Sequence, residues 1–448
     1  MNLPKDFEQK MRDLLGSQAD DFFKSLDNPS QKAITVNFER LKKDVFEKNC
    51  DFEIESIPLT QNGYFASIPK FSQNVFNHMG VIYSQEPSAM YPVELMDIRP
   101  QDICLDVCAS PGGKSIQILE KLGGSGLLVS NEIAFSRAKI LRENLTRMGF
   151  DNFIITCNSS EELARSNILF DKILVDAPCG GEGMIRKNNF DMNFYNPTSI
   201  DSNAERQLKI LENVSQLLKS NGTLVYSTCT YDIRENENVI FNFIKKHSDF
   251  EIIHKPEFLA VCDSGIKIED VSTNYALRRY PHRFKGEGQF MIILKKVDGE
   301  ISSQPKPSLP KCYCELNQKE LMTVLSTLKG VINIKLDSLV KINDEIYVLP
   351  KCKLNLKNLN VIYLGVHVGT LQKNVFKIAH ECYHTYGKYF EKKIELNELD
   401  VYKYLHGEEL SFDRPNGIYA VEFLGVTLGG GKMTNGKLKN YYPKELRI

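Results

Sequence analysis

Short apolar segments alternate with amphipathic ones from Asp102 onward, and this alternation limits the fold more than any other feature of the chain. Runs of strand length occur at Ile103 to Val107, Leu127 to Ser130, Phe153 to Thr156, Ile173 to Val175 and Thr223 to Tyr226. Helical patterns separate them at Lys114 to Lys121, Ala134 to Met148, Ala204 to Leu218 and Glu235 to His247. Strands that alternate with helices form βαβ units, so we expect an α/β fold on a parallel, doubly wound sheet. The late run Gln289 to Leu294 can close that sheet.

The rest of the chain divides on both sides of this region. A length of 448 residues exceeds the size at which one core stops growing, so several domains are expected. An amphipathic helix over residues 4–26, with strands near 33–37 and 53–57, predicts a small N-terminal α+β unit over residues 1–76. The doubly wound region covers 77–298, and the proline-rich segment 299–311 predicts a linker. A first C-terminal domain over 312–372 and a β-rich module over 373–448 follow.

Composition excludes several classes of protein. Hydrophobic residues make up 42% and charged residues 25% of the chain, and no apolar run approaches the roughly 20 residues of a membrane span. The N-terminus has no basic and apolar leader, so we expect a cytoplasmic protein without a membrane partner. The 11 cysteines are scattered and form no Cys-x-x-Cys pair, which favours reduced thiols over disulfides or a structural zinc site.

The formal net charge of -1 predicts no global attraction to nucleic acid, but two local clusters are basic. One runs from Arg278 to Lys285 and interleaves cations with aromatic rings, and the other is the tail from Lys432 to Arg447. Such clusters suit a phosphate backbone with stacked bases, and an ordinary solvated face has the same composition. Both interpretations stay open for each cluster.

A loop with two adjacent glycines follows the first strand of the alternating region: Cys108-Ala109-Ser110-Pro111-Gly112-Gly113-Lys114. Adjacent glycines let a ligand approach the backbone, and the N-terminus of the next helix favours an anionic group. The end of the loop matches a phosphate-binding P-loop, but that pattern requires a glycine where this chain has Cys108.

Glu132 ends the second strand about 20 residues further on, where a carboxylate can accept hydrogen bonds from both ribose hydroxyls. A solvated helix cap would also place an acid there. The loop and the acid together favour a nucleoside cofactor with a carboxylate end over an ATPase or GTPase.

Two cysteines follow two strands of the same sheet. Asp176 and Cys179 come after the run Ile173 to Val175 in a glycine-rich turn, and Cys229 comes after the run Thr223 to Tyr226. The carboxyl ends of parallel strands border one crevice, so we expect the two thiols to face one substrate.

A free thiol has a pKa of about 8.5 and needs a neighbouring donor, cation or helix N-terminus to act as a nucleophile. Lys114 and Arg186 are candidate cations for this crevice. A single buried cysteine more often packs as a small hydrophobic side chain, which is what we expect of Cys104 and Cys157.

These segments resemble the motifs of the S-adenosylmethionine-dependent RNA cytosine-5 methyltransferases in order and spacing. The segments that carry the resemblance are Asp106-Val-Cys-Ala-Ser-Pro-Gly-Gly-Lys114, Asp176-Ala-Pro-Cys179-Gly-Gly-Glu-Gly and Ser227-Thr-Cys229-Thr. The C-terminal Leu438-Lys-Asn-Tyr-Tyr-Pro-Lys-Glu-Leu-Arg447 is similar to the small-subunit ribosomal RNA methyltransferase F branch, so the resemblance covers nearly the whole chain. It implies a Rossmann-like class I methyltransferase domain between an N-terminal RNA-contacting unit and a C-terminal PUA-like RNA-binding domain.

The same resemblance implies methyl transfer from S-adenosyl-L-methionine to C5 of a cytosine in 16S rRNA. Cys229 would attack C6 of the base, and Cys179 would assist loss of the C5 proton and release of the enzyme. Asp176 would hydrogen-bond the base edge beside the cofactor. The methionine end of the cofactor would lie along the loop from Cys108 to Lys114, and Glu132 would bind the ribose.

The adenine position departs from the family pattern, because this chain has Asn158 where relatives often carry an Asp.

The partner implied is ribosomal RNA in the small subunit or an assembly intermediate, acted on by a monomer. The alternative class is a noncatalytic RNA-binding or ribosome-assembly protein that keeps the fold. Retention of both Cys179 and Cys229 favours the enzyme.

A second motif, His380-Glu381-Cys-Tyr-His384, matches the H-E-x-x-H pattern of zinc peptidases. The longer form of that pattern needs a third His where this chain has Phe390, although Glu395 or Glu398 could replace it. We expect a packed helix here and no metal site, with the zinc peptidase as the alternative.

Overall fold

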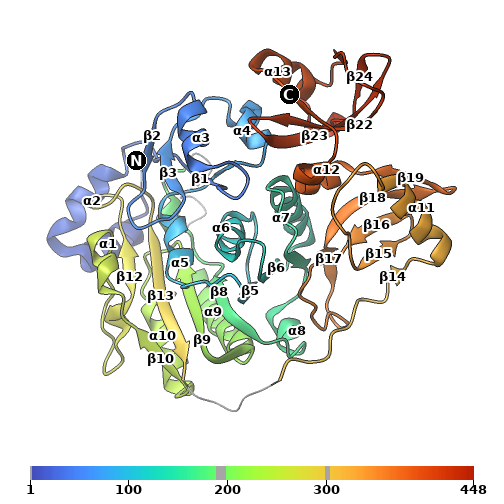
Figure 1. Ribbon diagram of the computed structural model, residues 1–448. Coiled ribbons are helices and arrows are strands. Elements are labelled where there is room, and N and C mark those ends of the chain that lie inside the picture. Colours follow the sequence, from blue (N-terminus) through green and yellow to red (C-terminus); the bar gives the residue numbers. More distant parts are fainter. Residues whose placement is uncertain (1–2, 188–197, 298–302) are drawn as a thin grey trace.

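The computed structural model describes residues 3–187, 198–297 and 303–448. The described residues exclude 298, the last residue of the predicted central domain, and 299–302, the first residues of the predicted linker. The largest element is a ten-stranded sheet (Figure 1). Its strand order is β11 (Asp263–Ser264), β12 (Leu277–Arg279), β13 (Gln289–Lys296), β9 (Leu218–Thr228), β8 (Phe170–Asp176), β5 (Ile103–Asp106), β6 (Leu127–Asn131), β7 (Phe153–Thr156) and β17 (Val361–Leu364), with β10 (Phe250–Ile253) also paired to β13.

The five central strands, β7, β6, β5, β8 and β9, are parallel, and β13 runs antiparallel to β9. The chain starts at β5, builds outward to β7 and then returns to β8, so the direction of winding reverses between β5 and β8. In sheets of this kind a ligand binds at that switch point, beyond the carboxyl ends of the strands. The predicted Rossmann-like α/β fold is confirmed.

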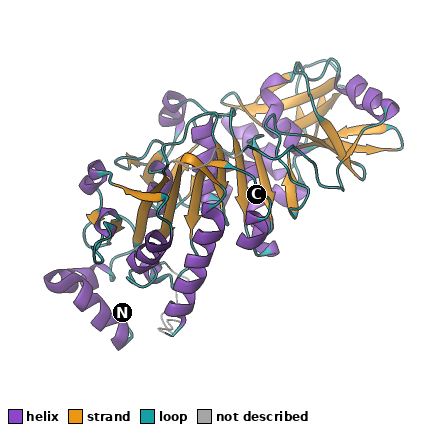
Figure 2. Ribbon diagram, turned by 90° about the horizontal axis from the view of Figure 1, so that it is seen from below, coloured by secondary structure: helices purple, strands orange, loops and turns teal. Residues whose placement is uncertain are grey.

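Helices cover both faces of the sheet (Figure 2). Side chains alternate along each buried strand, so Leu105 packs in the core under α8, α9 and α10 and Cys104 in the core under α5, α6 and α7. The bounds of these helices are α5 (Tyr91–Glu94), α6 (Gly113–Leu122), α7 (Phe135–Arg147), α8 (Ser160–Ala164), α9 (Ser199–Ser215) and α10 (Glu237–Lys246).

Helix α9 differs from the prediction of a helix over Ala204 to Leu218. It begins at Ser199 and ends at Ser215, because Leu218 already belongs to β9 and pairs with Phe170 of β8. Among the described residues, no helix is long and apolar enough to cross a bilayer.

The N-terminal unit is a four-stranded antiparallel sheet preceded by a helical arm. The sheet order is β2 (Ile54–Ser56), β3 (Gly63–Ala66), β1 (Ala33–Val36) and β4 (Ile82–Ser84), with α3 (Lys43–Asn49) and α4 (Val75–His78). The predicted single helix over 4–26 is wrong in detail. It consists of α1 (Lys5–Leu15) and α2 (Ala19–Ser25), because Gly16 takes a left-handed φ of 54° and ends α1.

The C-terminal part contains two five-stranded sheets. The first consists of β14 (Cys314–Glu315), β15 (Leu339–Ile342), β16 (Glu345–Val348), β18 (Val366–Gln372) and β19 (Val375–Ile378), with α11 (Gln318–Leu328). The second consists of β20 (Lys393–Glu395), β22 (Gly417–Phe423), β23 (Val426–Thr434), β24 (Lys437–Asn440) and β21 (Leu410–Ser411), with α12 (His380–Tyr386) and α13 (Glu398–His406).

The last sheet and the N-terminal sheet lie side by side and share one hydrophobic core (Figure 1). Arg40, which is half-buried, links the two units at this junction. Its guanidinium donates to the carbonyl oxygens of Met79 (2.8 Å), His384 (2.9 Å) and Thr427 (3.1 Å). The two ends of the chain therefore form one body that borders the central sheet.

Candidate active site

The two thiols predicted to face one substrate lie side by side. Strands β8 and β9 pair in register up to Asp176 and Ser227, so the loops that follow them start at the same level. Cys179 and Cys229 occupy these loops, and their sulfur atoms are 3.4 Å apart. Both side chains are half-buried. The geometry suits two groups that act in turn on one ligand.

Cys179 is held in its protonated form. The hydrogen bond to the Cys229 sulfur and burial together raise the pKa of the Cys179 thiol well above its usual value. A protonated Cys179 can donate a hydrogen bond to the Cys229 sulfur.

Asp176 ends β8 beside the thiols and pairs with the cofactor loop. Lys114 Nζ donates to its Oδ2 at 2.7 Å, and Ser227 Oγ donates to its Oδ1 at 2.6 Å. Burial alone would lower the pKa of Lys114, but the charge of Asp176 and their hydrogen bond outweigh burial and raise it. Lys114 stays cationic in this crevice. The other candidate cation, Arg186, forms an ion pair with buried Glu287 at 3.1 Å and has no hydrogen bond to either thiol.

The loop from Cys108 to Gly113 joins β5 to α6 and is pinned from α7. Arg137 Nη2 donates to Ser110 O at 2.9 Å, and Asn144 Nδ2 donates to Pro111 O at 2.8 Å. Gly112 takes a φ of 119°, a left-handed value that favours glycine. This conformation places the free amides of the α6 N-terminus, including that of Lys114, at the crevice.

Asp106, at the end of β5, is a site residue that the sequence interpretation missed. Ser115 Oγ donates to its Oδ2 at 2.7 Å, while its buried Oδ1 has no hydrogen-bond partner within the described residues. Burial raises the pKa of Asp106 to about 7. The sequence feature that could have identified Asp106 is an acidic side chain at the end of the first parallel strand.

Glu132 and Asn158 lie at the ends of β6 and β7. Glu132 is 3% exposed, so it is no solvated cap, although its Oε1 accepts a hydrogen bond from Ala134 N at 3.0 Å. The Asn158 side chain donates to Glu162 at 3.2 Å and accepts from Asn360 N at 3.1 Å. Asn360 precedes β17, so the C-terminal part borders this side of the crevice, a contact that local sequence patterns do not contain.

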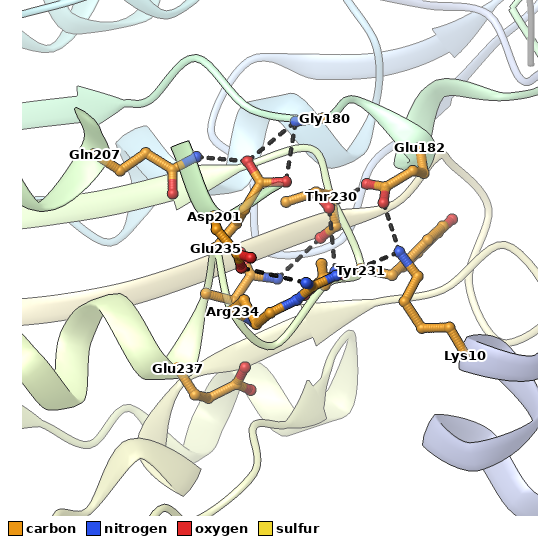
Figure 3. A network of polar contacts seen from close by, with 12 residues as sticks. Lys10, Gly180, Glu182, Asp201, Gln207, Thr230, Tyr231, Arg234, Glu235 and Glu237 are labelled. Carbon is orange, nitrogen blue, oxygen red and sulfur yellow. Dashed lines mark hydrogen bonds and ion pairs between the residues drawn. The ribbon is translucent and has the colours of Figure 1, made fainter. Parts of the chain in front are cut away.

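A second missed residue, Glu235, supports the Cys179 loop. Its carboxylate accepts hydrogen bonds from Gly180 N at 3.1 Å and from Gln207 Nε2 at 2.7 Å (Figure 3). Burial raises the pKa of Glu235 to about 7. The signal was weak, because Glu235 lies in a polar stretch before α10 and nothing local relates it to Cys179.

The H-E-x-x-H residues pack between domains. His384 Nε2 donates to Arg147 O at 2.6 Å, and Glu381 accepts from Tyr363 Oη at 2.6 Å. Burial and the nearby charge of Arg40 lower the pKa of His380 to about 4. Within the described part of the chain, no group of three or more His, Cys, Asp or Glu side chains is arranged to hold a metal.

The first basic cluster has both buried and exposed members, and its exposed cations are Arg283 and Lys285. Arg278 and Arg279 are 2% and 3% exposed, and Arg278 Nε pairs with buried Glu237 at 2.7 Å. These arginines hold loops together and are not free for phosphate. The tail lysines Lys432 and Lys439 are exposed and face each other across β23 and β24, so this cluster remains accessible.

Comparison with known families assigns most of the chain. Residues 93–295 match the family described as 16S rRNA methyltransferase RsmB/F. Residues 3–87 match the N-terminal domain of 16S rRNA methyltransferase RsmF, and residues 391–448 match the methyltransferase RsmF PUA domain. The three matches follow one another along the chain in the order of the domains described above.

Individual relatives cover the full length. "Ribosomal RNA small subunit methyltransferase F" of Shewanella piezotolerans is 29% identical over 95% of this chain and 93% of its own. The protein of the same name from Psychromonas ingrahamii is 29% identical over 99% of this chain and 97% of its own.

Solved structures match the fold over part of the chain. A methyltransferase homolog protein from Pyrococcus horikoshii has a TM-score of 0.58 at 27% identity, covering 66% of this chain and 95% of that one. NSun6 from Pyrococcus horikoshii with SFG has a TM-score of 0.57 at 20% identity, covering 66% of this chain and 99% of that one, and supports the fold alone.

Proposed function

The chain belongs to the RsmF branch of the RsmB/F methyltransferases, and from this premise we propose that it methylates C5 of a cytosine in 16S rRNA. The proposed methyl donor is S-adenosyl-L-methionine, and the proposed substrate is the small ribosomal subunit or an assembly intermediate of it. The match of residues 391–448 to a PUA domain supports RNA as the substrate class. The observation that carries the proposal is the pair of thiols 3.4 Å apart beside Asp176.

The residues around the crevice fit this methyl donor. Its ribose needs an acceptor, which Glu132 provides, and its carboxylate suits Lys114 and the amides at the start of α6. Its ammonium group suits a buried carboxylate oxygen that has no hydrogen-bond partner among the described residues, and Asp106 Oδ1 is such an atom. When bound, S-adenosyl-L-methionine supplies an electrophilic methyl group.

C5 of cytosine is a poor nucleophile, so the protein must first activate the ring. By the resemblance to the family we assign the attack to Cys229, whose sulfur lies 3.4 Å from that of Cys179 and whose thiol proton passes to solvent. A bond from Cys229 Sγ to C6 moves the C5–C6 π electrons toward C5 and N3, and C5 can then take the methyl group. Asp176, held by Lys114 and Ser227, orients the base edge.

Cys179 then completes the reaction. Its raised pKa depends first on the hydrogen bond to Cys229, and that bond is lost once Cys229 is joined to C6. Without that bond Cys179 can release its own proton to solvent, and the thiolate sulfur then accepts the C5 proton. Removal of that proton restores the C5–C6 double bond and expels Cys229.

Serine substitutions at the two thiols test the proposal. With 16S rRNA or isolated small subunits and the methyl donor, Cys229→Ser should give no methylation and no covalent complex. Cys179→Ser should accumulate a protein–RNA adduct that survives denaturing gel electrophoresis, because release is blocked. Cys312→Ser, at an exposed cysteine of the C-terminal part, should behave as wild type.

Bisulfite sequencing of 16S rRNA from cells with and without the gene gives the second readout. A cytosine that is protected only when the gene is present supports the proposal. If no cytosine changes and neither thiol variant forms an adduct, the enzyme assignment fails and a noncatalytic RNA-binding role replaces it.

A further inference from the structure

Lys10 of the N-terminal helix α1 reaches the loops that carry both thiols (Figure 3). Its Nζ lies 2.6 Å from Glu182 Oε1 and 3.2 Å from Asp232 Oδ2. Glu182 follows Cys179 by three residues, and Asp232 follows Cys229 by three residues. One ammonium group therefore bridges the two loops from outside the catalytic domain.

Glu182, which contacts Lys10, is also bonded to the loop that carries Cys229. The Glu182 side chain is 0% exposed, and its Oε2 accepts the hydroxyl hydrogen of Thr230, the residue next to Cys229. The neighbouring backbone adds a second link, because Gly183 N donates to Cys229 O at 2.8 Å and Gly288 N donates to Gly183 O at 2.8 Å. Glu182 and its neighbour Gly183 are thus bonded directly to the Cys229 loop.

The charge of Lys10 is what makes this buried carboxylate tolerable. Within the described residues, no other cation contacts Glu182, whereas Asp232 also pairs with Arg234 at 3.1 Å. Removing one partner of a buried ion pair leaves a charge without compensation, and the group that carries it must protonate or move. The loss of Lys10 therefore acts first on Glu182 and through it on the Cys229 loop.

Apolar contacts hold the helical arm against these loops independently of the ion pair. Phe7, Met11 and Phe22 of the arm pack with Ile185 and Tyr231 in a separate cluster. The Phe22 and Tyr231 rings meet edge to face with centroids 5.3 Å apart. Since this cluster remains when the ammonium group is removed, the arm is expected to stay docked in a variant that lacks it.

We propose that Lys10 is a positioning residue that, through Glu182 and Thr230, holds Cys229 Sγ opposite Cys179 Sγ. The inference rests on the proposed function, in which Cys229 attacks the cytosine ring. It gives the N-terminal arm a part in the chemistry that its place in an RNA-contacting unit does not imply.

A cross-linking experiment tests the geometry without RNA or methyl donor. Diamide oxidises two adjacent thiols to a disulfide and is itself reduced, and peptide mass spectrometry measures the rate at which the Cys179–Cys229 bridge forms. Lys10→Met should slow this rate by about tenfold, because sulfur atoms that leave contact must find each other again. Lys10→Arg keeps the charge and should retain most of the rate.

Two further variants separate positioning from general damage. Lys10→Met combined with Glu182→Gln removes both charges and should recover most of the wild-type cross-linking rate. Lys5→Met, at an exposed position of the same helix, changes the net charge equally and should have no effect. A Lys10→Met protein that forms the bridge at the wild-type rate or faster would overturn the proposal.

Transfer kinetics give the functional readout. In single-turnover methyl transfer to small subunits, Lys10→Met should lower the rate by about tenfold while the RNA dissociation constant stays within about twofold. A wild-type protein that transfers no methyl group would refute the proposed function, whereas the cross-linking rates decide the role of Lys10 in either case.

Discussion

Gly183 offers a direct test of how tightly the thiol loops are packed. A methyl group placed on its Cα would lie 2.6 Å from Cys229 O, 2.8 Å from Gly288 O and 3.0 Å from Gly288 Cα. All three are backbone atoms, so no side-chain rotation can relieve the contacts. Gly183→Ala must therefore push the backbone of Cys229 and the backbone of Gly288 away from residue 183.

The size of that displacement sets the expected effect. An ordinary contact of 3.4 Å requires shifts of about 0.8 Å for Cys229 O and about 0.6 Å for Gly288 O, and overpacking of this kind costs ~1–3 kcal/mol in the free energy of unfolding. Because Cys229 moves with its carbonyl group, we expect the methyl-transfer rate to fall by about 100-fold.

Single-turnover methyl transfer and urea unfolding measure the two effects, and Gly123→Ala is the matched control. Gly123 has a φ of 52° and open space around it, so alanine there costs ~1 kcal/mol of backbone strain without moving the thiols. Both variants should lose stability, and only Gly183→Ala should lose its transfer rate. A Gly183→Ala protein with wild-type stability and rate would refute this account of the loop packing.

Two other predictions concern stability and RNA binding. Burial raises the pKa of Glu120 to about 8 from 4.5, so the folded state keeps a proton that the unfolded chain releases, and the free energy of unfolding should fall as pH rises between those values. Glu120→Gln should flatten this slope in urea unfolding, and an unchanged slope would contradict the assignment. Arg278→Met leaves Glu237 buried without its cation and should cost ~3–5 kcal/mol of stability without weakening RNA binding by the folded protein. Lys432→Met combined with Lys439→Met should instead keep stability and lower the salt dependence of RNA binding, measured by fluorescence anisotropy, by about two units of slope; the opposite pattern would assign RNA contact to Arg278.

The central sheet could be predicted because its signal is local. A parallel strand buried on both faces is a continuous apolar run, as in Ile173 to Val175, and each run here is flanked by a helical pattern. The errors arose where long-range contacts or single backbone angles decide the structure. Gly16 divides the predicted N-terminal helix, and β17 joins the edge of the sheet beside β7 from more than 200 residues away. Neither event changes the periodicity of its own segment.

In the candidate site, as in the sheet, the residues with a local sequence signal could be predicted and those positioned by long-range contacts could not. Asp176, Cys179 and Cys229 follow strands, so their convergence follows from the topology of a parallel sheet. The groups that hold them in place, such as Glu235 and Lys10, are polar residues in helices or loops with no distinctive local pattern. Their function depends on tertiary contacts, and a single sequence does not contain those.

The flanking units contact the candidate site on two sides. On the thiol side, Lys10 of the N-terminal arm compensates the buried Glu182, and on the opposite side Asn360 of the C-terminal part donates to Asn158. The segment 93–295, which matches the methyltransferase family by itself, contains neither Lys10 nor Asn360. The catalytic geometry that we propose therefore depends on residues outside segment 93–295, and we expect RNA contacts with either flanking unit to affect the thiol loops through these side chains.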